Sequence, residues 1–513
     1  MENFKSGNTP LIITVSLLSS SIWLFTHGKY INGDEAIIGL MAIKISQFAD
    51  FPLFFWKAHY SGPIASYLVA PLHLIWKPSG LLLHSIVIPF HLFFSCGTYL
   101  LCRKWLNEKA AIVAGLMAAL PPKLFPYSPL GGYTESVSFF PWIMLISLGM
   151  NHNEYSDIRT STRFIGAGFL CGFAIWIFPF SISISLICFF FVCRGFGKRP
   201  LIVAVSGCLL ALFPVIFYNA LHPGASILRL MARPFAIDKH GFAELLSSKN
   251  IFQIVGTLFL NWVENSYQSL LNIPDYTLQL FQLSANYSIW NRVTGVISLI
   301  GVLAVVIFYF CKHENQKLVS SALFAIIWSS YLFLLIFGMN RYRYLIPVLT
   351  VIPFGIALIL TKTPLFENRN LMIFALCLIL LINGLSNFSN TSQKASNFSD
   401  LIQLLDSKGL RKGYANYFIS YPLIYLSNER LIFTPVLHDP KNDRYPEYTY
   451  LVSKSDNPAF IFVNRNNETT FREQLSKYRI SAKVLKWGAY RIFYELTPEI
   501  DPEKFNMSLG SIP

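Results

Sequence analysis

Long apolar stretches constrain this chain more than any other feature of its sequence. Segments such as TGVISLIGVLAVVIFYF and YLIPVLTVIPFGIALIL approach the roughly 20 apolar residues that a helix needs to cross the hydrocarbon core of a bilayer. The chain of 513 residues is 53% hydrophobic and only 13% charged, whereas soluble domains carry roughly 25% charged residues. The sequence therefore predicts an α-helical polytopic membrane protein.

The apolar stretches predict about eleven transmembrane helices. The expected spans are 11–27, 81–101, 109–121, 135–150, 163–178, 179–194, 200–219, 293–311, 318–338, 344–361 and 371–386. The first is expected to be a retained span, because no small-residue cleavage pattern follows it. Short connections such as CRKWLNEK and RGFGKRP each carry at least two Lys or Arg, which is typical of cytoplasmic loops. We therefore expect a cytoplasmic N-terminus in a multi-pass plasma membrane, the inner membrane in a bacterium.

An odd number of spans places three large pieces on the non-cytoplasmic side. These pieces are the loops 28–80 and 220–292 and the tail after the last span. The tail contains the strand-like runs FIFV and YRIFYEL and a helical pattern that ends at Gly409. We expect a transmembrane domain over 1–386 and a small periplasmic or extracellular α/β domain over 387–513.

Charge and cysteine usage exclude two classes of site. The formal net charge is +14, but the basic residues are dispersed and not clustered, and excess Lys and Arg are ordinary in the cytoplasmic loops of membrane proteins. We therefore expect no nucleic-acid partner. The eight cysteines fall within or at the ends of apolar segments, without the histidine spacing of a zinc site. They are interpreted as small packing residues.

The first outer loop contains two apolar stretches that are too short to span a bilayer. Residues 36–49 and 63–76 are predicted to be helices that lie in the membrane interface. The aromatic residues that we place at headgroup depth are Trp56, Tyr60, Tyr67 and Trp76.

The first of these helices begins with two acidic residues in YINGDEAIIG, Asp34 and Glu35. One interpretation is structural, because Asn32, Gly33 and Asp34 all suit a helix N-cap, and Glu35 would then lie in the first turn. The other is functional, with one carboxylate acting as a general base at the membrane surface. The two interpretations are compatible, since a helix cap can hold a catalytic carboxylate in place.

Three segments resemble the GT-C membrane glycosyltransferases. They are GDEAIIGLMAIKISQFADFPLFFWKAHYSGPIASYLVAP, PPKLFPYSPLGGYTES in the second outer loop, and NRYRYLIP. The resemblance is closest to the branch of protein O-mannosyltransferases and lipid A aminoarabinose transferases. It implies a polyprenyl-phosphate sugar as donor, a lipid, glycan or protein as acceptor, and a single inverting displacement at the non-cytoplasmic face. In this resemblance Asp34 is the catalytic base, and Glu35 orients a loop or contacts the acceptor.

A departing phosphate requires cations, and arginine forms bidentate, charge-assisted bonds to phosphate oxygens. Arg341 and Arg343 in NRYRYLIP are candidates. The alternative is that they mark a membrane boundary, with Tyr342 and Tyr344 as interfacial anchors. The other arginines considered for phosphate binding are Arg229 and Arg233.

One departure from the family pattern affects phosphate binding. Aminoarabinose transferases carry a Glu-Lys pair where this chain has Ser61 and Gly62. We expect Lys57 or His59 to replace the missing lysine, or the arginines to bind phosphate alone. The departure also puts aminoarabinose in doubt as the donor sugar.

Glu135 in GGYTES is a candidate second acidic residue, because the two preceding glycines allow a ligand to approach the backbone closely. The alternative is a first-turn glutamate after a Thr134 cap. The aromatic candidates for contact with the acceptor or other substrate are Tyr133, Tyr60 and Tyr344.

Two other functions share a lipid-linked substrate. A flippase or transporter would bury ionisable residues at mid-bilayer and show related halves, and the apolar stretches here are nearly free of acidic residues. A glycan ligase or polymerase would transfer a chain of sugars instead of one. We expect no required cofactor, but the metal requirement stays open. The oligosaccharyl branch of the family needs a divalent cation, whereas the branch closest to this chain is not thought to use one.

Overall fold

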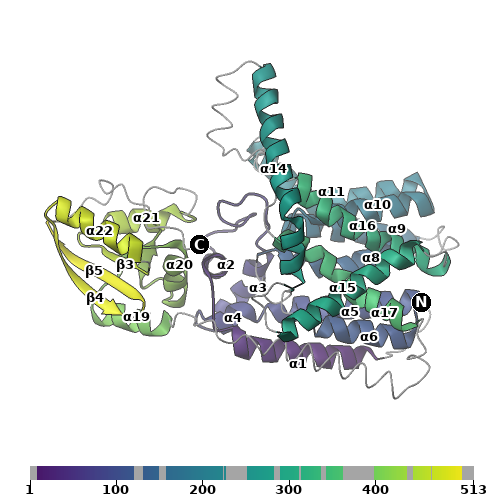
Figure 1. Cartoon of the computed structure of the whole chain (residues 1–513), viewed down its shortest axis with the longest axis horizontal. Helices are drawn as coiled ribbons and strands as arrows, with labels where there is room; N and C mark the ends of the chain where they lie inside the picture. The colour runs from purple at the N-terminus through teal and green to yellow at the C-terminus, as the bar shows by residue number, and fades with distance from the viewer. Residues whose placement is uncertain are drawn as a thin grey trace. The chain divides into compact units, whose positions relative to one another are not determined.

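The computed structural model divides into two compact units (Figure 1). Unit 1 comprises Met1–Trp23, His59–Gly62 and Val87–Gln393, and unit 2 comprises Leu24–Ala58, Pro63–Ile86 and Lys394–Pro513. The structure describes residues 8–120, 131–148, 158–222, 225–226, 251–281, 283, 289–310, 314–336, 342–361, 398–435, 443–463 and 465–498.

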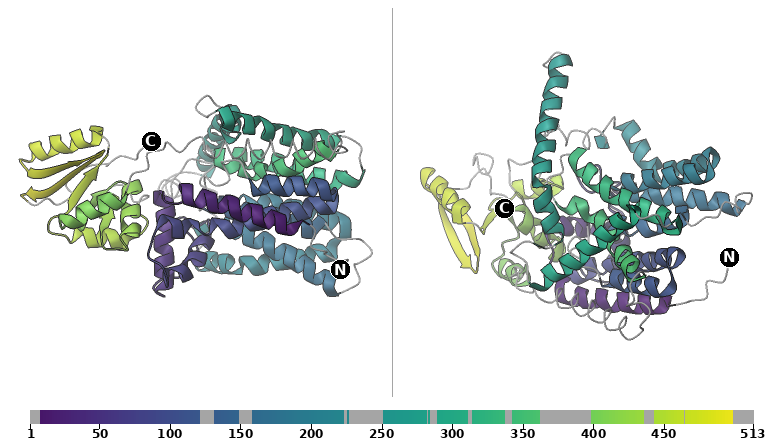
Figure 2. Two further views of the ribbon diagram at one scale, coloured as in Figure 1. Left: turned by 90° about the horizontal axis from the view of Figure 1, so that it is seen from below. Right: turned by 45° about the vertical axis from the view of Figure 1, so that its right-hand side comes forward.

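Most helices of unit 1 run beside one another as a bundle, from which α14 (Ile251–Leu280) projects (Figure 1, Figure 2). Helix α1 (Thr9–His27) contributes its residues up to Trp23 to this unit. The other elements are α5 (Val87–Trp105), α6 (Glu108–Ala119), α7 (Tyr133–Val137), α8 (Phe140–Leu148), α9 (Ile158–Ile177), α10 (Ser181–Phe196), α11 (Lys198–Leu221), α14 (Ile251–Leu280), α15 (Ile289–Phe310), α16 (Glu314–Ile336), the 3-10 helix η3 (Tyr342–Thr350) and α17 (Ile352–Thr361).

Four helical segments in the described part of the chain are long and apolar enough to cross a membrane. They are Thr9–His27, Gly80–Trp105, Lys198–Leu221 and Ile289–Ile307. The predicted mainly helical membrane fold is therefore confirmed, but the predicted number of about eleven spans is not. Several predicted spans form shorter helices instead, and the span predicted at 371–386 lies outside the described residues.

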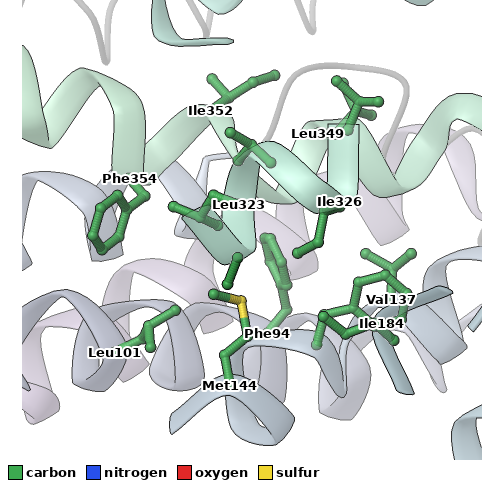
Figure 3. Close-up of a cluster of buried hydrophobic side chains, with 14 of the residues drawn as sticks. Phe94, Leu101, Val137, Met144, Ile184, Leu323, Ile326, Leu349, Ile352 and Phe354 are labelled. Carbon is green, nitrogen blue, oxygen red and sulfur yellow. The ribbon is translucent and has the colours of Figure 1, made fainter. Parts of the chain in front are cut away.

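Apolar side chains from distant parts of the sequence form the core of unit 1 (Figure 3). Phe94 of α5, Met144 of α8 and Ile184 of α10 meet Leu323 of α16 and Ile352 of α17 in this cluster. Each is no more than 3% exposed. Dispersion contacts of this density hold the helices together.

Glycines allow α9 and α11 to approach closely. A Cβ added to Gly168 would lie 1.7 Å from the Ala204 carbonyl oxygen, and one added to Gly172 would lie 2.4 Å from the Cys208 oxygen. The spacing Gly-x-x-x-Gly places both glycines on one face of α9, the arrangement that favours helix pairing in membranes. The described cysteines in this bundle are free thiols, and four are buried: Cys102, Cys171, Cys188 and Cys208.

Unit 2 joins the predicted first outer loop, between α1 and α5, to the tail. The loop provides α2 (Gly33–Ser46), α3 (Ile64–His73) and α4 (Gly80–His84). The tail provides α19 (Phe398–Ser407), β1 (Lys412–Ala415), α20 (Tyr417–Leu426), β2 (Ile432–Thr434), α21 (Pro446–Ser453), β3 (Ala459–Phe462), α22 (Arg465–Lys477), β4 (Ser481–Trp487) and β5 (Tyr490–Thr497). The domain boundary that we placed between 386 and 387 stays a prediction.

The tail contains a mixed sheet, as its alternating sequence pattern predicts (Figure 1). The strand order is β2-β1-β3-β5-β4. Strand β1 pairs in parallel with β2 and β3, whereas β5 is antiparallel to β3 and β4. The predicted strand runs FIFV and YRIFYEL correspond to β3 and β5, and the predicted helix is α19, followed by Gly409 at a φ of +69°. A φ of that sign is typical of glycine after a helix end.

Helix α2 differs from the expected interfacial helix because it is buried on nearly all sides. Apart from Asp34, Lys44 and Ser46, all of its residues are buried, and it packs against α3 and α20. Trp56, which we placed at headgroup depth, is only 8% exposed and stacks on Tyr445 of the tail. A run that is apolar all round, such as AIIGLMAI, suits this packing better than a helix with one face in water.

Gly39 tests the packing of α2. A Cβ at this position would lie 2.4 Å from the Tyr425 ring, so we expect Gly39→Ala to lower the free energy of unfolding by about 1–3 kcal/mol. The matched control is Gly166→Ala in α9, where an added Cβ meets nothing within 4 Å. Thermal and denaturant unfolding in detergent would compare the two. Equal stability of the two variants would contradict the close packing.

Candidate functional site

The carboxylate of Asp34 lies in the first turn of α2. The N-cap is Asn32, which completes a capping box with Glu35. The Asn32 Oδ1 accepts a hydrogen bond from the Glu35 N–H at 3.0 Å, and the Glu35 Oε2 accepts one from the Asn32 N–H at 2.8 Å. Such reciprocal bonds satisfy two of the free N–H groups at a helix start. Asp34 is partly exposed and takes no part in this capping box.

Glu35 lies in the interior of unit 2. It is 6% exposed, and its Oε1 lies 3.3 Å from Nε2 of His84 at the end of α4. The Nδ1 of the same imidazole lies 2.9 Å from the Gly28 carbonyl oxygen. Glu35 thus connects α2 to α4 and to the residues before α2. These contacts give Glu35 a structural role.

Asp34 accepts a hydrogen bond from a tyrosine of the tail. The Tyr417 hydroxyl donates a hydrogen bond to the Asp34 Oδ1 at 2.5 Å. Burial raises the pKa of Tyr417, the negative charge of Asp34 raises it further, and Arg444 opposes both. The phenol therefore stays protonated at neutral pH and remains a hydrogen-bond donor to the carboxylate.

The segment around Arg444 packs against the first outer loop. The Arg444 Nη1 donates to the Trp56 carbonyl oxygen at 3.5 Å, and its guanidinium lies 5.6 Å from the centroid of the Phe55 ring. Lys57, a predicted phosphate contact, lies 3.8 Å from an Asp443 carboxylate oxygen. The lysine side chain is 36% exposed, so the pair is weak and leaves Lys57 accessible.

Three aromatic candidates gather in unit 1 around Phe178. The Phe178 ring lies 4.5 Å from the Tyr133 ring, 6.2 Å from the Tyr60 ring and 6.2 Å from the Tyr344 ring, measured between centroids. His59 contacts Tyr218 of α11: its Nδ1 lies 3.1 Å from the Tyr218 hydroxyl.

Glu135 is buried in α7 of unit 1, with 1% of its surface exposed. Its Oε1 accepts the Gly131 N–H at 3.1 Å, and the Thr134 hydroxyl lies 3.4 Å from its Oε2. Gly131 and Gly132 have φ values of +157° and +86°. Glu135 thus lies in the first turn of α7, as its structural interpretation predicts, but the predicted cap at Thr134 is wrong, because Thr134 lies inside the helix and the N-cap is Gly132. A role of Glu135 in the site stays a prediction.

The predicted arginines are not tested by the structure. Arg229, Arg233 and Arg341 lie outside the described residues, and only the backbone of Arg343, in η3, is described. Their role in phosphate binding stays a prediction. Within the described ranges, no three His, Cys, Asp or Glu side chains lie together as metal ligands.

Sequence reasoning did not identify Tyr417 and Arg444 individually. The stretch GYANYFISYPLIYLSNERLIFTP attracts attention as a candidate cover or acceptor-binding segment, but nothing in it singles out one tyrosine. Tyr417 is separated from Asp34 by 383 positions, and one sequence holds no signal for a pairing over that distance.

No protein-family model and no curated protein matches the sequence. Solved structures do match it. The oligosaccharyltransferase from Archaeoglobus fulgidus in complex with Zn and sulfate is 14% identical, with a TM-score of 0.52, and the match covers 90% of this chain and 69% of that chain. ArnT from Cupriavidus metallidurans bound to undecaprenyl phosphate is 12% identical, with a TM-score of 0.51, and the match covers 95% of this chain and 98% of that chain. The apo state of ArnT gives the same TM-score and identity, over 96% of this chain and 98% of that chain.

The matches span nearly the whole chain, including the helices of unit 1 and the tail, so they concern the complete architecture and not one helix pair. At these identities they establish the fold. The expected GT-C fold is thereby confirmed, whereas the expected number of about eleven spans stays a prediction.

Proposed function

We propose that the chain is a membrane glycosyltransferase that moves a sugar from a polyprenyl-phosphate donor to a lipid, glycan or protein acceptor. The GT-C fold supports the reaction class, and a structure of ArnT holds undecaprenyl phosphate. The observation that carries the proposal is the environment of Asp34. Its carboxylate is partly exposed at the start of α2, and one of its oxygens is bonded by a buried phenol.

The reaction is a single displacement. The acceptor hydroxyl or amide attacks the anomeric carbon, the bond between that carbon and the phosphate oxygen breaks, and the acceptor proton moves to Asp34. Polyprenyl phosphate leaves as a stable anion, so the reaction needs no general acid, in contrast to glycoside hydrolysis with its pair of carboxylates. One base and cations near the phosphate suffice.

Lys57 is a candidate cation in unit 2, since its ammonium is accessible and its pairing with Asp443 is loose. The predicted arginines, Arg341 and Arg343 with Arg229 and Arg233, remain candidates for the same task. Individual Arg→Lys variants would test them, because lysine keeps the charge but loses the bidentate geometry.

We place the reaction on the non-cytoplasmic face of a plasma membrane, with the N-terminus in the cytoplasm. The Lys and Arg content of the short loops supports this orientation. The requirement for a divalent cation is open. The A. fulgidus oligosaccharyltransferase was crystallised with Zn, so turnover would be measured both with a chelator and with added divalent ions.

Identification of the bound lipid tests the proposal most directly. The full chain would be purified with its native lipids, and the co-purified lipids would be analysed by mass spectrometry. We expect a polyprenyl phosphate or its sugar-bearing form, and we expect the purified chain to release free polyprenyl phosphate from that donor when acceptor is present. Lipid translocation without cleavage would instead indicate a flippase, and transfer of a multi-sugar chain would indicate a ligase.

A further inference from the structure

Helix α20 lies alongside α2 within unit 2, and two of its tyrosines touch the glycines of α2. A Cβ at Gly33 would lie 2.6 Å from the Tyr417 ring, and one at Gly39 would lie 2.4 Å from the Tyr425 ring. Both rings therefore pack directly on the α2 backbone. This close packing fixes the position of the Tyr417 phenol relative to the helix turn that carries Asp34.

The two carboxylate oxygens of Asp34 have different surroundings. Oδ1 accepts the hydrogen bond of the Tyr417 hydroxyl, whereas Oδ2 accepts none from residues that the structure describes. The Tyr417 side chain is only 9% exposed, so water competes little for its hydroxyl. The hydrogen bond therefore fixes Oδ1, whereas Oδ2 can accept a proton.

A second contact holds the phenol in place. The guanidinium carbon of Arg444 lies 5.8 Å from the centroid of the Tyr417 ring, and Arg444 also bonds the Trp56 carbonyl oxygen. The ring thus contacts both the backbone of α2 and a guanidinium that is itself hydrogen-bonded to the loop before α3. The elevated pKa of Tyr417 keeps its proton on the phenol oxygen.

We propose that Tyr417 is the positioning residue for the base, selecting the side-chain rotamer of Asp34 in which Oδ2 takes the proton of the acceptor. The inference depends on the proposed role of Asp34. A partly exposed aspartate samples several staggered rotamers, and a charge-assisted hydrogen bond from a buried donor selects one of them. The tail thereby contributes to the reaction without contacting the reacting atoms.

Loss of the hydroxyl should affect the chemical step and not binding. In Tyr417→Phe the ring still packs on Gly33, but Asp34 is free to rotate. Misplacement of a catalytic group by about 1 Å costs on the order of 100-fold in rate, so we expect kcat to fall by about 10- to 100-fold with an unchanged KM for the donor. A fall in kcat alone is the signature of an interaction that matters in the transition state.

The matched control is Tyr425→Phe. It removes the same hydroxyl two turns further along the same helix, where the partner is the Ser79 carbonyl oxygen at 3.2 Å and not a carboxylate. Both variants would be made in the full chain, reconstituted in lipid nanodiscs, and assayed with a panel of undecaprenyl-phosphate sugars. We expect the control to keep the parent kcat, and both variants to bind undecaprenyl phosphate like the parent.

A spectroscopic measurement tests the contact without any donor. Fluorotyrosine introduced at position 417 reports ionisation of the phenol through its fluorine resonance. Burial raises the pKa of Tyr417, and the charge of Asp34 raises it further, so Asp34→Asn should lower the pH at which residue 417 ionises. The same label at position 425 should not respond to Asp34→Asn.

The outcomes separate the inference from the proposed function. Full turnover in Asp34→Asn would show that Asp34 is not the base and would contradict the proposed mechanism. Loss of turnover in Asp34→Asn together with a parent-like kcat in Tyr417→Phe would overturn the positioning role alone. So would a fluorotyrosine at position 417 that titrates identically in the presence and absence of the Asp34 carboxylate.

Discussion

Replacing Asp34 with asparagine is expected to lower kcat by about 100- to 10,000-fold, the usual contribution of a positioned general base. Asparagine has nearly the same shape as aspartate and can still accept the Tyr417 hydroxyl bond through its amide oxygen. It cannot take a proton from the acceptor. Turnover would be measured as release of polyprenyl phosphate from the donor, alongside thermal unfolding of the same preparation.

The control for this variant is Asp50→Asn, which makes the same change in the same outer loop. The Asp50 carboxylate accepts the Trp56 indole N–H at 3.0 Å, a bond that an asparagine oxygen preserves. Parent-like turnover is expected there, and both variants should keep the unfolding midpoint and the affinity for undecaprenyl phosphate. Residual kcat above about one-tenth of the parent value in Asp34→Asn would argue against general-base catalysis at this position.

Glu35→Ala is expected to reduce the free energy of unfolding by about 2–4 kcal/mol. Loss of a helix cap costs about 0.5–2 kcal/mol, and a buried polar group left without its partner costs about 1–3 kcal/mol. Both losses apply, since Glu35 accepts the N–H of the N-cap Asn32 in the capping box and contacts the buried His84. Denaturant unfolding in detergent, monitored by near-ultraviolet circular dichroism, would measure the change.

Glu35→Gln distinguishes structure from chemistry at the same position. Its amide oxygen can still accept the Asn32 N–H, so most of the stability and most of the turnover should survive. The opposite pattern, with intact stability and turnover lost, would show that Glu35 contacts substrate, as its resemblance to the acidic pair of GT-C enzymes implies.

The helical membrane fold and the sheet of the tail could be predicted because their signals are local. A run of apolar residues indicates a span, and alternation in YRIFYEL indicates a strand. The helix after Gly33 was also predictable, including Asn32 among its candidate caps. The span count was not, since short apolar helices such as α8 and α17 satisfy the same hydropathy pattern as a full span.

The surroundings of the acidic pair could not be predicted because they depend on distant contacts. Asp34 and Glu35 are adjacent and chemically similar, yet one is partly exposed and the other is buried against His84. Their difference follows from how α4 and α20 pack on α2, which neighbouring residues do not encode. The residues alone thus predict where the carboxylates lie in the chain, whereas the choice of Asp34 as the base comes only from the family resemblance.

The pairing of α2 with α20 has a consequence for biogenesis. Asp34 leaves the ribosome 383 residues before Tyr417, which at roughly 5–20 residues per second is a delay of about 20–80 s. Throughout this interval the apolar surface of α2 that α20 will cover has no native partner. Synthesis of the last quarter of the polypeptide therefore determines when the region around α2 matures, and a chain stalled before that point presents this surface to insertases and quality-control proteases.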